Sequence, residues 1–230
     1  EPSIAALAAA CPAHVGLRCE GEETVQSACD RLCASVSAWY SHDAQGRWYV
    51  GLLSLPTGPA VATLEDVLRS DPLECLPHQV TEDGAPAWRV TVRYGRNHTV
   101  QQRSDLAAVI TDDPAQAARV EWLGQAWRDA VAEDATVKTA YPSAGEITVE
   151  TCLDAQADAE ALAADLLTMF REPRNFWRAR VPLASLAGVE LGRDVLLKHR
   201  RLGLGAGRLM TVTGVARDLG RRLARLTLWG

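Results

Sequence analysis

The residues of this sequence best suited to metal binding or nucleophilic chemistry are its six cysteines and five histidines. Cys29 and Cys33 lie one helical turn apart, but structural zinc sites usually show tighter pairs of ligands, and a third ligand would have to be a distant histidine. His98 could act as a general base only with a positioned partner, which the sequence does not identify. We therefore predict no metal site, and we expect Cys29 and Cys33 to be buried, reduced thiols on a helix face.

Signatures of catalysis or cofactor binding are absent from the sequence. It contains no G-x-S-x-G, no H-E-x-x-H and no P-loop. Its glycine-rich segment, Gly203–Gly207, would need a helix N-terminus directly after it to bind phosphate. The residues that follow, Arg208–Val212, have the composition of a strand instead. We therefore predict a hairpin connection there, no catalytic residue and no cofactor.

Composition places the chain among ordinary globular proteins. Its 230 residues are 47% hydrophobic and 23% charged, which suffices for one large or two small domains. No apolar run approaches the roughly 20 residues that span a bilayer, so we expect no membrane insertion. The first residues lack Met and a basic segment, so they do not resemble a signal peptide, and we expect the chain to be part of a longer protein.

Charge is distributed unevenly along the chain. From Arg171 to Gly230 there are 13 basic and 4 acidic residues, a net charge of +9, whereas residues 1–170 carry −14. Such asymmetry suggests that the two parts contact different partners. The alternative is that the arginines simply cover the solvent-exposed face of a β-sheet.

The first 60 residues predict a helix followed by a β-hairpin. Apolar residues recur at helical spacing over Glu22–Val36. Two aromatic, β-prone runs then flank a turn-like segment at Ser41–Gly46. We expect this unit, residues 1–60, to form a separate lobe, and a short helix to follow it over Thr63–Arg69.

Two further helices are predicted in the middle of the chain. Asp113 has the position of an N-cap and is followed by proline, so a helix should run from there to about Ala132. Asp154 should cap a second helix, whose apolar stripe ends at Phe170. Between them, Glu146–Cys152 alternates like a strand.

The remaining strands predict a small antiparallel barrel. Trp88–Tyr94 alternates apolar and polar residues, so only one of its faces can be buried. Four short strands follow Pro173, separated by glycine-containing turns. We therefore predict an α+β fold in which residues 61–230 form a barrel-like domain from the Trp88 strand and the antiparallel strands of about residues 173–230, with a helical insertion at about 113–141.

Exposed arginines and one tryptophan are the candidate interface residues. Trp122 and Trp127 lie five residues apart in the predicted helix, so they cannot both face one core, and we expect Trp122 to meet another subunit. Arginines on the polar faces of strands discourage indiscriminate edge pairing and can bind a neighbour's carboxylates. The candidate subunit interface therefore consists of Arg89, Arg93, Trp122, Arg221, Arg222 and Arg225.

Three stretches carry motifs that are shared with a known family. The first is the helix and hairpin of Glu23–Leu52, with a D-x-x-G turn, and the second is Trp88–Gln101, which begins W-x-V-x-V-x-Y-x-x-N. The third runs from Thr151 to Gly230 and contains L-G-x-x-V, V-x-G and the ending L-x-L-W-G. In these motifs the chain resembles the C-terminal part of phage and prophage tail-hub proteins, which form tail tips and baseplate hubs and are related in fold to type VI secretion spikes. The segment Asp113–Tyr141 has no counterpart in this pattern.

The resemblance implies a structural protein of the virion tail, assembled in the bacterial cytoplasm and without enzymatic activity. It implies a homotrimeric ring at the distal end of the tail tube, in contact with distal tail and tape-measure proteins, with DNA only passing through its lumen. Two other functions stay open on the residues alone. One is a tail-associated hydrolase domain, and the other is a receptor- or carbohydrate-binding module that uses exposed aromatic residues such as Trp48, Tyr49 or Trp122.

Overall fold

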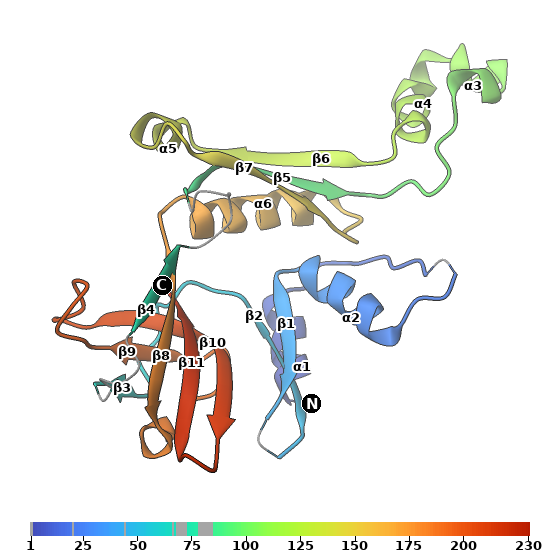
Figure 1. The fold of residues 1–230 in the computed structure, drawn as a ribbon. Coiled ribbons are helices and arrows are strands. Elements are labelled where there is room, and N and C mark those ends of the chain that lie inside the picture. The colour runs from blue at the N-terminus through green and yellow to red at the C-terminus, as the bar shows by residue number, and fades with distance from the viewer. Residues whose placement is uncertain (1, 20, 44, 66, 68–72, 78–84) are drawn as a thin grey trace.

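The computed structural model describes residues 2–19, 21–43, 45–65, 67, 73–77 and 85–230 (Figure 1). Within these residues the strands form a two-stranded, a three-stranded and a six-stranded sheet with helices packed beside them, which confirms the predicted α+β class. The helices are α1 (Pro2–Ala10), α2 (Val25–Ala34), α3 (Ala108–Thr111), α4 (Ala117–Gly124), α5 (Ala135–Ala140) and α6 (Gln156–Phe170), with short 3-10 turns η1 (Arg103–Asp105), η2 (Pro114–Gln116) and η3 (Leu183–Leu186). The strands are β1 (Ala38–His42), β2 (Trp48–Leu52), β3 (Thr63–Leu64), β4 (Glu74–Pro77), β5 (Ala87–Tyr94), β6 (Arg128–Glu133), β7 (Gly145–Glu150), β8 (Asn175–Pro182), β9 (Asp194–Leu197), β10 (Arg208–Asp218) and β11 (Leu223–Trp229).

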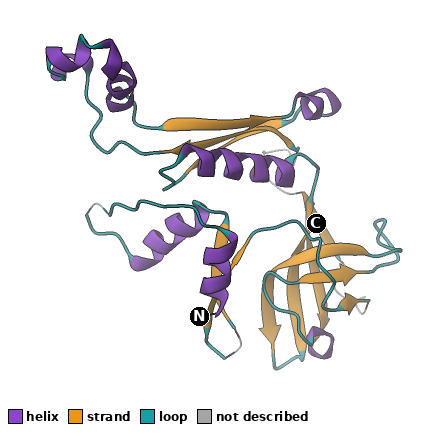
Figure 2. Ribbon diagram, turned by 180° about the vertical axis from the view of Figure 1, so that it is seen from behind, coloured by secondary structure: helices purple, strands orange, loops and turns teal. Residues whose placement is uncertain are grey.

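The N-terminal unit is the predicted helix and hairpin, preceded by one more helix. α2 begins after Thr24, whose hydroxyl oxygen accepts a hydrogen bond from the backbone N–H of Ser27 at 3.1 Å. β1 and β2 pair antiparallel, and α1 lies alongside them (Figure 2). α2 has no buried side chain, so Cys29 and Cys33 are half-buried rather than buried as predicted. The reason is that α2 packs against a two-stranded hairpin, which offers too little surface to cover a helix face.

The six-stranded sheet has the order β3-β9-β10-β11-β8-β4 and contains all four strands predicted after Pro173. Its pairs are antiparallel except β3 with β9. Side chains on one face, such as Val195, Met210 and Leu226, are fully buried and form the larger core. β3 and β4 lie at the two edges, and among the described residues no pairing joins these edges into a closed barrel.

The Trp88 strand belongs to the other large sheet, which corrects the prediction that it joins the C-terminal strands. β5 pairs antiparallel with β6 and parallel with β7, and α6 covers one face of these strands. Val90 and Val92 are buried there against Leu162 of α6. Because the helix already covers the apolar face of β5, that face needs no second sheet. A bulge between β5 and β7 buries Ala87 and leaves Trp88 half-buried.

The helix predicted from Asp113 to about Ala132 is also wrong in its second half. Asp113 does accept a hydrogen bond from the backbone N–H of Ala115 at 2.9 Å, as an N-cap should. The helical segment, however, ends with α4 at Gly124. From Arg128 onward the chain forms β6, because these residues pair with β5 along their whole length.

Two smaller predictions fail for similar reasons. Asp154 does not cap α6, since Ala155 holds the N-cap position and makes no side-chain hydrogen bond there, while the Asp154 carboxylate lies beside Gly16. Thr63 and Leu64 form β3 rather than a helix because they pair with β9. Residues 66 and 68–69, the greater part of the remaining predicted helix, lie outside the described residues.

Candidate functional site

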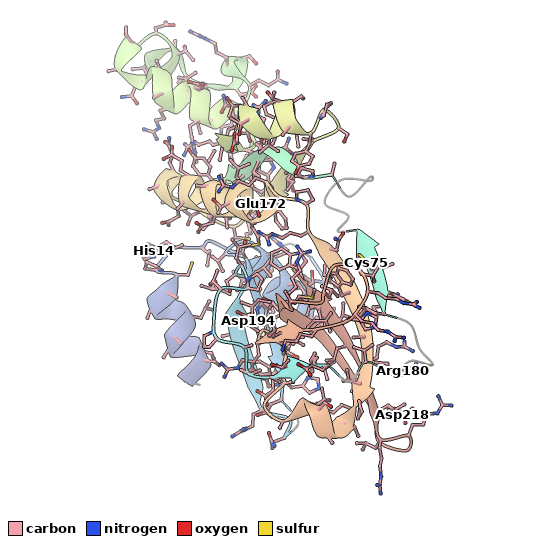
Figure 3. The ribbon with its side chains drawn as sticks, turned by 90° about the vertical axis from the view of Figure 1, so that its left-hand side faces the viewer. His14, Cys75, Glu172, Arg180, Asp194 and Asp218 are labelled. Atoms are coloured by element: carbon pink, nitrogen blue, oxygen red, sulfur yellow. The ribbon has the colours of Figure 1, made fainter. Side chains whose placement is uncertain are left out.

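A hollow lined mainly by arginines lies beside the turn between β10 and β11, and we call it the arginine hollow. Its volume is about 260 Å³. Figure 3 shows Arg180 and Asp218 at this end of the molecule. Asp218 is the one acidic residue among the described residues that line it. The lining residues are Arg180, Ala216, Arg217, Asp218, Arg221, Leu223, Ala224 and Arg225.

Strand alternation places two of these arginines, Arg180 and Arg225, on the outer face of the six-stranded sheet. Ala224 and Leu226 of β11 are fully buried, so Arg225 between them must point away from the core. In the register of β11 with β8, Arg225 is directly opposite Arg180. Like charges directly opposite each other are unfavourable in a sheet, so two guanidinium groups placed in this way favour carboxylate partners.

The turn next to this pair holds two more arginines in defined positions. The backbone N–H of Arg221 donates to the Asp218 carboxylate at 3.0 Å, and the Arg221 guanidinium lies 3.8 Å from the same side chain. Arg222 has a φ of 54°, in the left-handed region that lets the chain reverse into β11. Asp218 thus holds Arg221 at the hollow through both the backbone and the side chain of the arginine.

The six residues predicted as an interface do not form one surface. Arg221, Arg222 and Arg225 lie together at the β10–β11 turn, whereas Arg89, Arg93 and Trp122 lie on or beyond the three-stranded sheet (Figure 1). Arg93 already pairs within the chain, at 3.1 Å from Glu150 and 3.8 Å from Asp129. The Trp122 ring lies under the guanidinium of Arg128 at 5.4 Å.

Sequence reasoning missed Arg180 and Arg217 as members of the cluster. The alternation in Phe176–Val181 shows that Arg180 points outward, but only the register of β8 against β11 reveals that it faces Arg225. Arg217 is opposite Ala224, one pair away, and its place also depends on strand register. The local sequence pattern could have identified Arg180 as an outward-pointing arginine. It could not have identified the residues that lie beside Arg180 on the neighbouring strands.

A second surface is formed by a helical arm that projects from the three-stranded sheet at the other end of the molecule (Figure 1). We use this term for residues 97–127, which connect β5 to β6 through η1, α3, η2 and α4. None of them is buried. The arm is held by hydrogen bonds from the Asn97 side-chain amide to the carbonyl oxygens of Trp122 and Leu123, at 3.4 and 3.0 Å.

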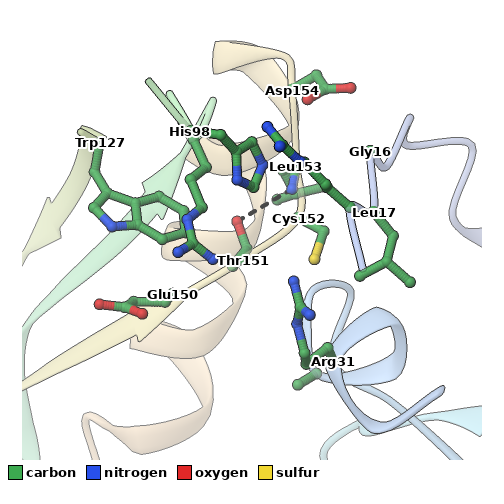
Figure 4. A pocket seen from close by; sticks show the side chains of 13 residues that line it. Gly16, Leu17, Arg31, His98, Trp127, Glu150, Thr151, Cys152, Leu153 and Asp154 are labelled. Atoms are coloured by element: carbon green, nitrogen blue, oxygen red, sulfur yellow. Dashed lines mark hydrogen bonds between the residues drawn. The ribbon is translucent and has the colours of Figure 1, made fainter. Parts of the chain in front are cut away.

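A larger hollow, of about 520 Å³, separates the α2 unit from the end of β7 (Figure 4). Arg31 reaches it and is fixed by Glu23, with both carboxylate oxygens accepting hydrogen bonds at 2.9 and 3.1 Å. This hydrogen bonding lowers the pKa of Glu23. Cys152 and His98 also line the hollow, but the thiol is directed toward Arg31 rather than toward the imidazole. The pair therefore lacks the thiol–imidazole contact that activates a cysteine nucleophile.

All six cysteines are free. Among the described residues, no group of three or more His, Cys, Asp and Glu side chains is arranged to hold a metal ion. No helix in the described ranges combines the length and the apolar composition needed to cross a bilayer.

Solved structures that are similar to this chain include a virion protein and tail proteins. The chain superimposes with a TM-score of 0.55 and 15% identity on a protein of the virion of a native gene transfer agent particle, covering 89% of this chain and 38% of that one. It matches the tail protein from Neisseria meningitidis MC58 with a TM-score of 0.54 and 17% identity, covering 97% of this chain and 64% of that one. A 43 kDa tail protein of prophage MuSo2 from Shewanella oneidensis matches with a TM-score of 0.49 and 11% identity, covering 92% of this chain and 54% of that one.

The present chain therefore spans less than two thirds of the length of these proteins. At such low identity the likeness establishes a shared fold. The sequence matches no protein-family model and no curated protein sequence.

Proposed function

We propose that this chain is a non-catalytic structural component of a phage or prophage tail hub, assembled as a ring at the distal end of the tail tube. The observation that carries the proposal is the fold itself. It matches a virion protein and a tail protein over 89% and 97% of this chain, at TM-scores of 0.55 and 0.54. The location that follows from the proposal is the virion tail.

The charged surfaces support assembly from copies of the chain. Arg221, Arg222 and Arg225 are the centre of the proposed subunit interface, with Arg180 and Arg217 added to them. Arg89, Arg93 and Trp122 are retained as contacts on the other side of the subunit. Because a contact between two different surfaces either closes into a ring or continues as a filament, closure gives rotational symmetry, for which we propose a homotrimer.

The remaining parts of the proposal concern domains and partners. We propose that residues 1–60 are one domain and residues 61–230 another, the latter carrying the insertion at about 113–141 and the strands of residues 173–230. Distal tail and tape-measure proteins are the proposed partners, and DNA passes through the lumen without specific recognition.

The mass of the full-length protein in solution tests ring assembly. Sedimentation velocity at about 50 mM salt should give a closed trimer, and raising the salt should shift it toward smaller species, because exposed ion pairs are screened. Negative-stain images of the same sample should show rings. A monomer whose mass is independent of salt at high protein concentration would overturn the proposal.

A further inference from the structure

The helical arm has neither the buried residues nor the helix length that would make it stable by itself. No residue of the arm is buried, and its α-helices contain only four and eight residues. Helices this short are marginal in water without tertiary packing. Val109 on α3 is 79% exposed. The arm therefore has the character of a segment that is covered in an assembly.

Acidic side chains outnumber basic ones on the arm, which also exposes Val109. Arg103 and Arg119 are its basic residues, and the Arg103 guanidinium is directed back to the carbonyl oxygen of Thr111 at 3.0 Å. Four acidic residues outnumber them, and all four are exposed. They are Asp105, Asp112, Asp113 and Glu121. Asp112 and Asp113 adjoin each other between α3 and η2, where they present two carboxylates together.

The arginine hollow has the complementary properties. Four arginines line it against one acidic residue, Asp218. Next to Asp218 in the same turn, Leu219 is 76% exposed. Each surface thus combines one strongly exposed aliphatic side chain with charges of one prevailing sign, and the signs are opposite. Guanidinium groups bind carboxylates in bidentate geometry, which makes such a contact directional as well as attractive.

The two surfaces lie at opposite ends of the molecule in both views (Figures 1 and 3), so one chain cannot bring them together. We infer that the helical arm of one copy docks on the arginine hollow of a second copy, with Asp112 and Asp113 among the arginines. This inference rests on the proposed function, since it names the contact that builds the ring. The contact would place carboxylates of the second copy beside Arg180 and Arg225, which lie directly opposite each other in the sheet.

Charge reversal in the full-length protein tests the contact. The variants D112K/D113K and R221E/R225E should each weaken self-association by roughly tenfold or more, because each places like charges across the contact. Sedimentation equilibrium over a series of protein concentrations measures the change in the dissociation constant. The variant with all four substitutions should associate again with close to the original affinity. Circular dichroism melting verifies that each variant is folded.

Matched controls reverse the same number of exposed charges elsewhere. E160K/D165K on α6 and R200E/R201E after β9 should leave association unchanged. If both pairs weaken association but the fourfold variant does not recover, arm and hollow bind different surfaces and the inference is wrong. If no variant alters self-association, the inferred contact is wrong, but the proposed assembly of a ring is not contradicted. A monomeric natural protein would overturn the ring and this contact together.

Discussion

The indole of Trp39 on β1 packs against Gly192, in the connection between β8 and β9, so closely that a Cβ at Gly192 would overlap the ring. On its other side the ring covers Gly51 of β2, where a Cβ would lie 2.6 Å from it. The edge of the Tyr49 ring meets the same indole, with 5.4 Å between the centroids. Two glycines thus leave the space that lets the N-terminal hairpin dock on the six-stranded sheet.

Replacing Gly192 with alanine should undock the hairpin. The methyl group would overlap Trp39, and overpacking of this kind costs about 1–3 kcal/mol of unfolding free energy. The control is Gly188→Ala, because Gly188 has a similar φ of 73° but nothing within 4 Å of its Cβ position. Denaturant unfolding and proteolysis of the hairpin should affect G192A more than G188A. Equal losses of stability in G192A and G188A would mean that backbone strain at positive φ, rather than overlap with Trp39, causes the effect.

Replacing Arg225 with glutamine should separate stability from assembly. Removing Arg225 takes away a like charge directly opposite Arg180, so the free energy of unfolding should not fall, while self-association of the full-length protein weakens. Arg178→Gln is the matched control, because Arg178 lies on the same face of β8 but pairs with Glu74 at 3.6 Å. That variant should not gain stability. A loss of stability in R225Q would contradict the account of this pair.

The hydroxyl of Tyr40 donates to the Asp30 carboxylate at 2.7 Å, and this hydrogen bond raises the pKa of Tyr40 to about 12. Because the folded-state pKa lies above the unfolded value of about 10, the contribution to stability is fully present below pH 10 and is lost as pH rises toward 12. In D30N the pKa of Tyr40 should fall toward 10, which NMR titration of the tyrosine ring can measure. An unchanged pKa would show that Asp30 is not the cause.

Local sequence patterns predicted the elements whose apolar residues follow one clear periodicity along the chain. The apolar stripe of α6 and the alternation of β8 to β11 are both present in the structure. The stretch from Arg128 to about Ala132 continues the apolar stripe of a predicted helix, but pairing with the distant β5 makes it part of a strand. The partner of Arg225 could not be predicted either, since the register of two strands is a non-local property. The family resemblance anticipated the kind of proteins that share the fold.

The most direct test of the tail-hub proposal is a cryo-EM reconstruction of the phage or prophage particles produced from the genome that encodes this protein. The account predicts density for this fold in a threefold ring at the distal end of the tail tube, with the helical arm of each copy on the arginine hollow of the next. Particles that lack the protein, or density for it away from the distal end of the tail, would contradict the account.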